Sequence, residues 1–192
     1  MNQFQIAVVV GSLRKESFNR KLANAIIKLA PSDFSFKHAD ISRLPLYNQD
    51  DEASPTESVK RLKADIAAAD GVLFITPEYN RSIPGVLKNA IDQASRPYGQ
   101  SAWAGKPAGV LGISVGAPGS AMAQQHLRNI LAYLDMPTLG QPEAFVQMKD
   151  GLFDDAGNVG AASVKFLQNW MDQYVAWVRM LCARLREAVI LP

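Results

Sequence analysis

The chain has 192 residues and a formal net charge of +2, which fits one domain of ordinary size. Its hydrophobic fraction of 48% and charged fraction of 20% are typical of a globular protein and exclude a disordered or fibrous one. The small net charge excludes a strong field toward nucleic acid or a membrane surface, so any basic site must be local. No stretch has the apolar length of a membrane span.

Cysteine and histidine are scarce. Cys182 is the single cysteine, so an internal disulfide is excluded, and with His38 and His126 it forms no metal-ligand spacing. Residues 1–11 are too short to act as a signal peptide. We therefore expect a cytoplasmic protein that holds no metal ion.

The first elements alternate between strand and helix. Residues 4–10 read FQIAVVV, a β-branched apolar run that predicts a strand buried on both faces. Apolar residues at helical spacing predict a helix over 17–29, and a second strand follows over 34–39. Helical spacing returns over 58–69. The first 69 residues are therefore predicted to form a strand, a helix, a second strand and a second helix, in that order.

The same alternation continues in the second half of the chain. The run GVLFIT predicts a strand over 71–76, and periodic apolar residues predict a helix over 85–95. A third apolar run over 108–115 and a long helix over 120–134 follow. Strands that alternate with helices predict an α/β fold with a parallel sheet.

The last part of the chain completes this pattern. A fifth strand is predicted over 144–148 and a closing helix over 163–185, where Trp170, Tyr174 and Trp177 form a stripe typical of a core or an interface. Five strands and five helices in this length match a flavodoxin-like three-layer sandwich with a five-stranded parallel sheet in the order 2-1-3-4-5. We expect residues 1–192 to form this single domain.

Ligands of such sheets bind beyond the carboxyl ends of the strands, where the strand order reverses. The first loop there, residues 11–19, reads GSLRKESFN, and its side chains and helix-start N–H groups can donate to a phosphate. It contains neither a Walker A sequence nor GxGxxG. An alternative remains open, in which Ser17 only caps a helix and Arg14 is a solvated charge.

The second loop, residues 76–85, reads TPEYNRSIPG. Two prolines stiffen it, so its backbone can form a preorganised wall against the edge of a flat heterocycle, and Tyr79 can add an aromatic surface. A simple turn into the next helix would explain Pro84 and Gly85, but not the Glu, Tyr, Asn and Arg before them. The third loop, residues 114–120, is small and glycine-rich, which permits close approach to a ligand.

GSLRKESFN followed by TPEYNRSIPGVLKNAID resembles the NADPH-dependent FMN reductase family, which includes bacterial quinone and chromate reductases of flavodoxin-like fold. The resemblance extends from the first strand to about Leu134. It implies non-covalent FMN, reduction by NADPH or NADH, and ping-pong transfer to a quinone, a flavin or a metal oxyanion. It also implies a homodimer or homotetramer, with the helix after Ile83 in the interface.

The resemblance also implies the residues of the site. Those at the FMN phosphate would be Ser12, Leu13, Arg14, Ser17, Phe18 and Asn19. Those at the isoalloxazine ring would be Pro77, Glu78, Tyr79, Asn80, Arg81 and Ser114. The usual double glycine of the third loop is interrupted here, since Ala117 follows Gly116. No catalytic side chain is expected, because the flavin carries the chemistry.

Two other functions remain open from the sequence. One is a flavodoxin-type electron carrier that does not itself oxidise NAD(P)H, although Arg14 and the slightly basic charge are unlike the acidic surface of flavodoxins. The other is a flavin-free α/β binding or regulatory domain. Measurements of flavin content and of NADPH oxidation by the purified protein would distinguish both of these functions from that of a reductase.

Overall fold

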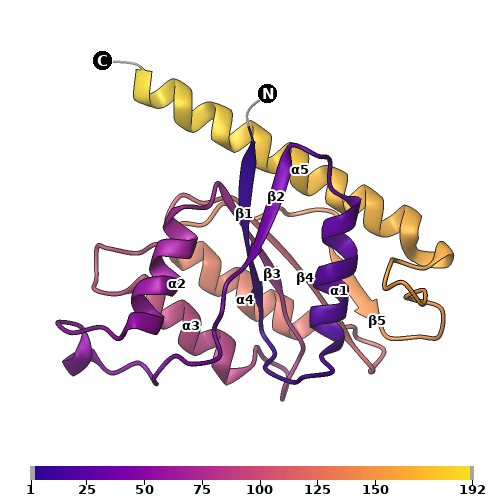
Figure 1. The fold of residues 1–192 in the computed structure, drawn as a ribbon, viewed down its shortest axis with the longest axis horizontal. Helices are drawn as coiled ribbons and strands as arrows, with labels where there is room; N and C mark the ends of the chain where they lie inside the picture. The colour runs from indigo at the N-terminus through magenta and orange to yellow at the C-terminus, as the bar shows by residue number, and fades with distance from the viewer. Residues whose placement is uncertain (1–2, 191–192) are drawn as a thin grey trace.

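The computed structural model describes residues 3–190, and the side chains as far as residue 184 (Figure 1). Its strands are β1 (Phe4–Val10), β2 (Phe34–His38), β3 (Gly71–Ile75), β4 (Ala108–Ser114) and β5 (Ala144–Gln147). Its α-helices are α1 (Phe18–Ile26), α2 (Glu57–Ala67), α3 (Gly85–Ser95), α4 (Ala121–Tyr133) and α5 (Ala161–Ile190). Two short 3₁₀ helices, η1 (Ile27–Leu29) and η2 (Gln49–Asp51), complete the set.

The five strands form one parallel sheet in the order β2-β1-β3-β4-β5, which confirms the predicted fold. β1 lies between β2 and β3, so that Val8 pairs with His38 on one side and with Leu73 on the other. The strand order reverses between β1 and β3. The carboxyl ends of these two strands therefore mark the switch point at which ligands of doubly wound sheets bind.

Helices cover both faces of the sheet (Figure 1). Val8 and Leu73 point to the face packed by α1 and α5, whereas Val9 and Phe74 point to the face packed by α2, α3 and α4. Successive strand residues point to opposite faces, so a strand covered on both sides must be apolar throughout. This is why the runs FQIAVVV and GVLFI predicted central strands.

The observed boundaries differ from the predicted ones mainly in two helices. The helix predicted over 17–29 ends at Ile26, and η1 tightens its last turn. The helix predicted over 163–185 instead spans residues 161–190. Ala161 and Ala162 at its start favour helix through their intrinsic propensity and not through an apolar stripe. The assignment of all 192 residues to one domain stays a prediction.

The predicted aromatic stripe lies in the core. Trp170 and Tyr174 of α5 are fully buried and stack with ring centroids 5.6 Å apart. They pack over Gly109 of β4, where a Cβ atom would come within 2.6 Å of the Tyr174 ring. Trp177 is partly buried and donates its ring N–H to the Pro137 carbonyl at 3.0 Å. Among the helices of the described region, none is long and apolar enough to cross a membrane.

Candidate cofactor-binding site

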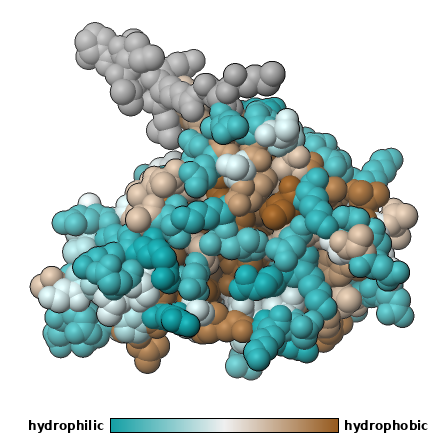
Figure 2. Space-filling model, in the orientation of Figure 1, coloured by the Kyte–Doolittle hydropathy of each residue, from teal (hydrophilic) through white to brown (hydrophobic). Residues whose placement is uncertain are grey.

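Three loops meet at the carboxyl edge of the sheet, the lower edge in Figure 1. The N–H of Gly11 donates to the Ile75 carbonyl at 2.8 Å, and the N–H of Thr76 donates to the Leu111 carbonyl at 3.0 Å. The parallel pairing thus places the loops after β1, β3 and β4 side by side. On the face shown in Figure 2, apolar side chains reach the surface among polar ones along this edge.

The first loop offers unpaired hydrogen-bond donors. Within the described residues, the backbone N–H groups of residues 12–16 have no hydrogen-bond partner. The Ser12 hydroxyl also makes no hydrogen bond there, although Ser12 is only 4% exposed. Polar groups in folded proteins are normally paired, and a helix N-terminus favours negative charge. This donor set therefore fits the phosphate of FMN.

The side chains of the first loop divide into a buried and an exposed set. Ser17 is buried and caps α1, since its hydroxyl oxygen accepts from the N–H of Arg20 at 3.3 Å. The structure therefore confirms that Ser17 is a helix cap. Leu13 and Arg14 are exposed, and the Arg14 guanidinium lies 5.6 Å from the centroid of the Phe18 ring. This cation–π contact keeps the positive charge of Arg14 close to the start of α1.

Asn19 has a partner that the sequence did not indicate. Its side-chain amide donates to the Ile113 carbonyl at 2.9 Å, and its carbonyl oxygen accepts from the N–H of Ile113 at 3.1 Å. Both residues are buried. Asn19 thus ties the start of α1 to the end of β4. No local pattern could show this pairing, because the partners are 94 positions apart.

The second loop forms a tight turn. Tyr79 and Ser82 exchange two backbone hydrogen bonds of 3.0 Å, and Asn80 and Arg81 between them have φ values of 53° and 64°. Positive φ at both central positions is the signature of a type I′ turn. Asparagine tolerates this conformation, but arginine in it costs about 1–2 kcal/mol. The turn projects Tyr79, which is 52% exposed, and Arg81 into solvent.

Helix α4 holds both ends of this turn. The Glu78 carboxylate accepts from the N–H groups of Met122 at 3.0 Å and Ala123 at 3.2 Å. Ser82 forms a side-chain hydrogen bond of 2.9 Å with Nδ1 of His126. The contact of Glu78 satisfies N–H groups that a helix N-terminus leaves free. The sequence showed only that His126 forms no metal-ligand spacing, and no local pattern could indicate a partner 44 residues away.

Strand β4 lies very close to the start of the second loop and to the end of the third. At Gly112 in β4, an added Cβ would lie 2.1 Å from the Thr76 carbonyl oxygen and 2.3 Å from Oγ of Ser120. Only glycine permits this approach. Ser114 is half-buried and donates to the Gly116 carbonyl at 3.1 Å, whereas Val115 is 71% exposed.

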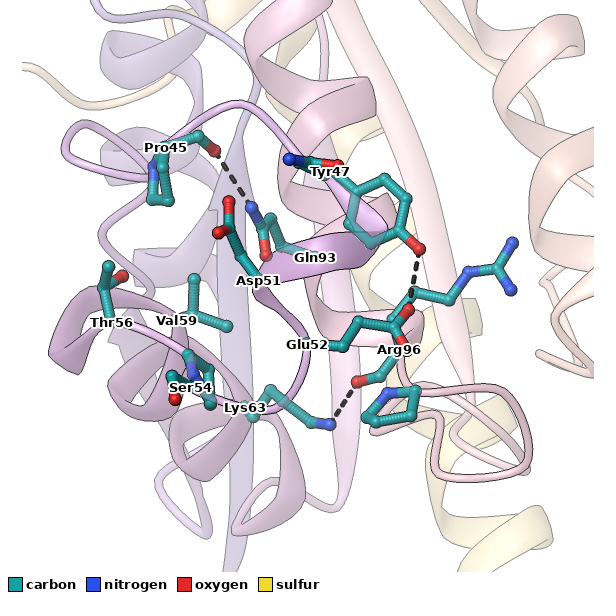
Figure 3. A pocket seen from close by; sticks show the side chains of 13 residues that line it. Pro45, Tyr47, Asp51, Glu52, Ser54, Thr56, Val59, Lys63, Gln93 and Arg96 are labelled. Atoms are coloured by element: carbon teal, nitrogen blue, oxygen red, sulfur yellow. Dashed lines mark hydrogen bonds between the residues drawn. The ribbon is translucent and has the colours of Figure 1, made fainter.

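A separate cavity of about 230 Å³ lies between η2, α2 and the end of α3 (Figure 3). Its polar groups are largely paired with one another. The Tyr47 hydroxyl donates to Glu52 at 2.7 Å, which raises the pKa of Tyr47, and Lys63 donates to the Arg96 carbonyl. None of its lining residues belongs to the three loops. The unpaired donors of the first loop therefore make the carboxyl edge the stronger candidate for a cofactor site.

The chain is similar to known proteins over most of its length. Residues 4–150 match the family model of NADPH-dependent FMN reductases. The chain is 55% identical over 176 residues to a 2-hydroxy-1,4-benzoquinone reductase of a Burkholderia species, covering 91% of this chain and 96% of the relative. It is 51% identical over 178 residues to a quinone reductase of Pseudomonas putida, with 92% and 96% covered.

The solved structure of FerB, a flavoenzyme NAD(P)H:(acceptor) oxidoreductase from Paracoccus denitrificans, is also similar. Its TM-score is 0.89 at 47% identity, and the match covers 92% of this chain and 98% of FerB. The matched family model includes the loops after β1, β3 and β4. The chain therefore belongs to the NADPH-dependent FMN reductase family, as its loop motifs predicted.

Proposed function

We propose that the protein is an FMN-dependent NAD(P)H oxidoreductase whose acceptor is a small quinone. The overall reaction would convert NAD(P)H, a proton and the quinone into NAD(P)⁺ and the hydroquinone. The quinone reductases among its relatives support this acceptor class. Free flavin and metal oxyanions such as chromate stay predictions as further acceptors.

The observation that carries the proposal is the set of unpaired donors in the first loop. Ser12 and the backbone N–H groups of residues 12–16 would bind the phosphate of FMN, with Ser17 and Arg14 adding a hydroxyl and a positive charge. Leu13 and Phe18 would adjoin it. Asn19 would act mainly by holding the start of α1 in place, since one hydrogen of its amide is already donated to Ile113.

The turn of the second loop would flank the isoalloxazine ring. When bound, FMN would supply the redox chemistry, accepting hydride from the nicotinamide and passing two electrons to the acceptor. Pro77 would stiffen the wall, and Tyr79 would present its exposed ring. The N–H groups of Glu78, Asn80 and Arg81 are unpaired in the part of the chain that is described.

Such fixed donors stabilise negative charge in a site from which water is excluded. Ser114, at the end of β4 where the third loop begins, would complete the ring site. Its hydroxyl is engaged with the Gly116 carbonyl. It would therefore contribute by shaping the loop that contacts the ring.

Arg81 would hold an anionic reductant or acceptor, because its charge is exposed at the tip of the turn. We expect Arg81→Ala to raise the KM for NADPH about tenfold, the loss of one charge-assisted contact. The KM for NADH, which lacks the 2′-phosphate, would change less. Unchanged Michaelis constants for NADPH and for all acceptors would contradict this role.

The test of the proposed function is a visible spectrum of the purified protein, followed by anaerobic addition of NADPH and then of a benzoquinone. We expect a flavin band that bleaches with NADPH and returns with the quinone. A flavin band that does not bleach without a partner reductase would instead identify an electron carrier. A colourless protein that does not take up added FMN would identify a flavin-free domain.

The proposal also includes the oligomeric state of the protein and its cellular compartment. The protein would form a homodimer or homotetramer with α3 in the interface, as its family resemblance implies, and would reside in the cytoplasm, as the single cysteine favours. Light scattering coupled to gel filtration distinguishes the two assemblies from a monomer.

A further inference from the structure

The turn at residues 79–82 is held from outside its own loop. Its two central residues adopt left-handed backbone conformations, and its backbone hydrogen bonds join only Tyr79 and Ser82 to each other. These bonds set the shape of the turn but not its direction relative to the sheet. From outside the loop, side-chain hydrogen bonds join it to the neighbouring helix α4.

Hydrogen bonds to α4 hold the turn on both sides. Before the turn, Glu78 accepts from the backbone N–H groups at the start of α4. After the turn, Ser82 is bonded to His126, one helical turn further along α4. Ser120, at the N-cap position of α4, has a φ of 69° and makes no side-chain capping bond. Glu78 therefore has a helix-capping role of its own, whereas the His126 contact serves only the turn.

We propose that His126 is a positioning residue, which fixes through Ser82 the orientation of the turn that flanks the flavin ring. His126 is exposed, and its imidazole shares a hydrogen bond of 2.9 Å with the Ser82 hydroxyl. An imidazole has two rotatable side-chain bonds, so it holds Oγ of Ser82 at little entropic cost. This inference rests on the proposed flavin site, because it assigns the turn to the ring.

Variants at position 126 separate the hydrogen bond from the fold of α4. His126→Ala removes the bond, whereas His126→Asn places an amide nitrogen or oxygen close to the position of Nδ1. Asn129→Ala is the matched control, since Asn129 is exposed on the same helix and is one turn further from the loop. Ser82→Ala removes the other partner of the bond.

The experiment titrates each apoprotein with FMN and follows the quenching of flavin fluorescence, together with the visible spectrum of the bound flavin. We expect His126→Ala to raise the FMN Kd about three- to tenfold, the loss of one net hydrogen bond. His126→Asn should restore most of the affinity, and Asn129→Ala should leave it unchanged. The double variant with Ser82→Ala should bind FMN about as well as either single variant, because both remove the same bond.

Several outcomes would overturn the inference. An FMN Kd and flavin spectrum of His126→Ala equal to those of the wild type would do so while leaving the proposed function intact. Fully additive effects of His126→Ala and Ser82→Ala would show that the two residues act independently. A melting temperature of apo His126→Ala lower by more than about 5 °C, not shared by Ser82→Ala, would show a structural role in α4 instead. A wild-type apoprotein that does not bind FMN would overturn the proposed function and this inference together.

Discussion

At the scale of single residues, the second loop holds a strained backbone next to the proposed ring site. Asn80 suits its left-handed conformation, but Arg81 does not, because its Cβ crowds the backbone when φ is positive. Strain of this kind persists where the surrounding contacts enforce it, and it is concentrated at functional sites. The bonds of Glu78 and Ser82 to α4 supply that enforcement.

Replacing Arg81 should show how much its backbone conformation lowers the stability of the apoprotein. We expect Arg81→Asn to raise the free energy of unfolding of the apoprotein by about 1 kcal/mol, because asparagine tolerates the left-handed region. Arg81→Ala keeps the strain and should show no such gain. Urea denaturation of both variants measures the difference, and equal stabilities would mean that Arg81 is not strained.

At the scale of elements, contacts between residues far apart in the sequence join helices to strands. The sequence patterns predicted each of these elements but not the contacts between them. Asn19 joins α1 to β4 through Ile113. Gly109 lets Trp170 and Tyr174 of α5 lie against β4. These two links hold α1 and α5 against the same strand, near its two ends.

Removing the Asn19 link should be costly. In Asn19→Ala, the buried N–H and carbonyl of Ile113 lose their partners, and each unsatisfied group costs about 1–3 kcal/mol. We expect the apoprotein to lose about 3 kcal/mol in urea denaturation. Asn24→Ala, at an exposed position of the same helix, is the control and should change stability little. A loss below 1 kcal/mol in Asn19→Ala would argue against the link.

Two glycine-to-alanine changes should have opposite effects. At Gly109 the new methyl group would overlap the Tyr174 and Trp170 rings, and overpacking of this kind costs about 1–3 kcal/mol. At Gly85, the first residue of α3, a Cβ meets nothing within 4 Å. There alanine should stabilise by about 0.5–1 kcal/mol through its better helix propensity. Thermal melts of the two variants that shift in the same direction would refute the packing described for α5.

At the scale of the whole molecule, stability should depend on pH through His38. Burial, and next the positive charge of Arg20, lower the pKa of His38 below its usual 6.5. The unfolded chain therefore binds a proton more readily than the folded protein when the pH falls below about 6.5. Neutral His38 therefore contributes to the free energy of unfolding. This contribution is complete above pH 6.5 and is lost as the pH falls toward the pKa of His38 in the folded protein.

We therefore expect the free energy of unfolding to decrease from pH 7.5 to pH 5.5, and His38→Phe to flatten this slope. The lowered pKa values of Asp40 and Asp154 act below pH 4, outside this window. Urea denaturation at a series of pH values gives the slope. An identical slope in His38→Phe would exclude His38 as its source.

FMN should stabilise the whole molecule by mass action. At a concentration 100 times its Kd, a ligand that binds only the folded state adds about 2.7 kcal/mol, which corresponds to about 5–10 °C for a chain of this size. Riboflavin, which lacks the phosphate, should give a much smaller shift in a thermal melt. Equal shifts for the two flavins would contradict the assignment of the first loop to the phosphate.

The sequence by itself determined the element order, the parallel sheet and the two switch-point loops. These follow from local chemistry: continuous β-branched runs such as FQIAVVV, helical spacing of apolar residues, and the prolines at both ends of the segment PEYNRSIP. Ser17 was recognisable as a helix cap for the same reason, because its partner Arg20 lies three positions away.

Only the tertiary structure decided which side chains act across the fold. Asn19 and Ile113, Ser82 and His126, and Glu78 and the start of α4 are each separated by more than 40 positions. Such pairs become neighbours only when β1, β3, β4 and their helices assemble side by side, so no local pattern encodes them. The sequence thus identified the loops that would hold the cofactor, and the fold determined what holds the loops.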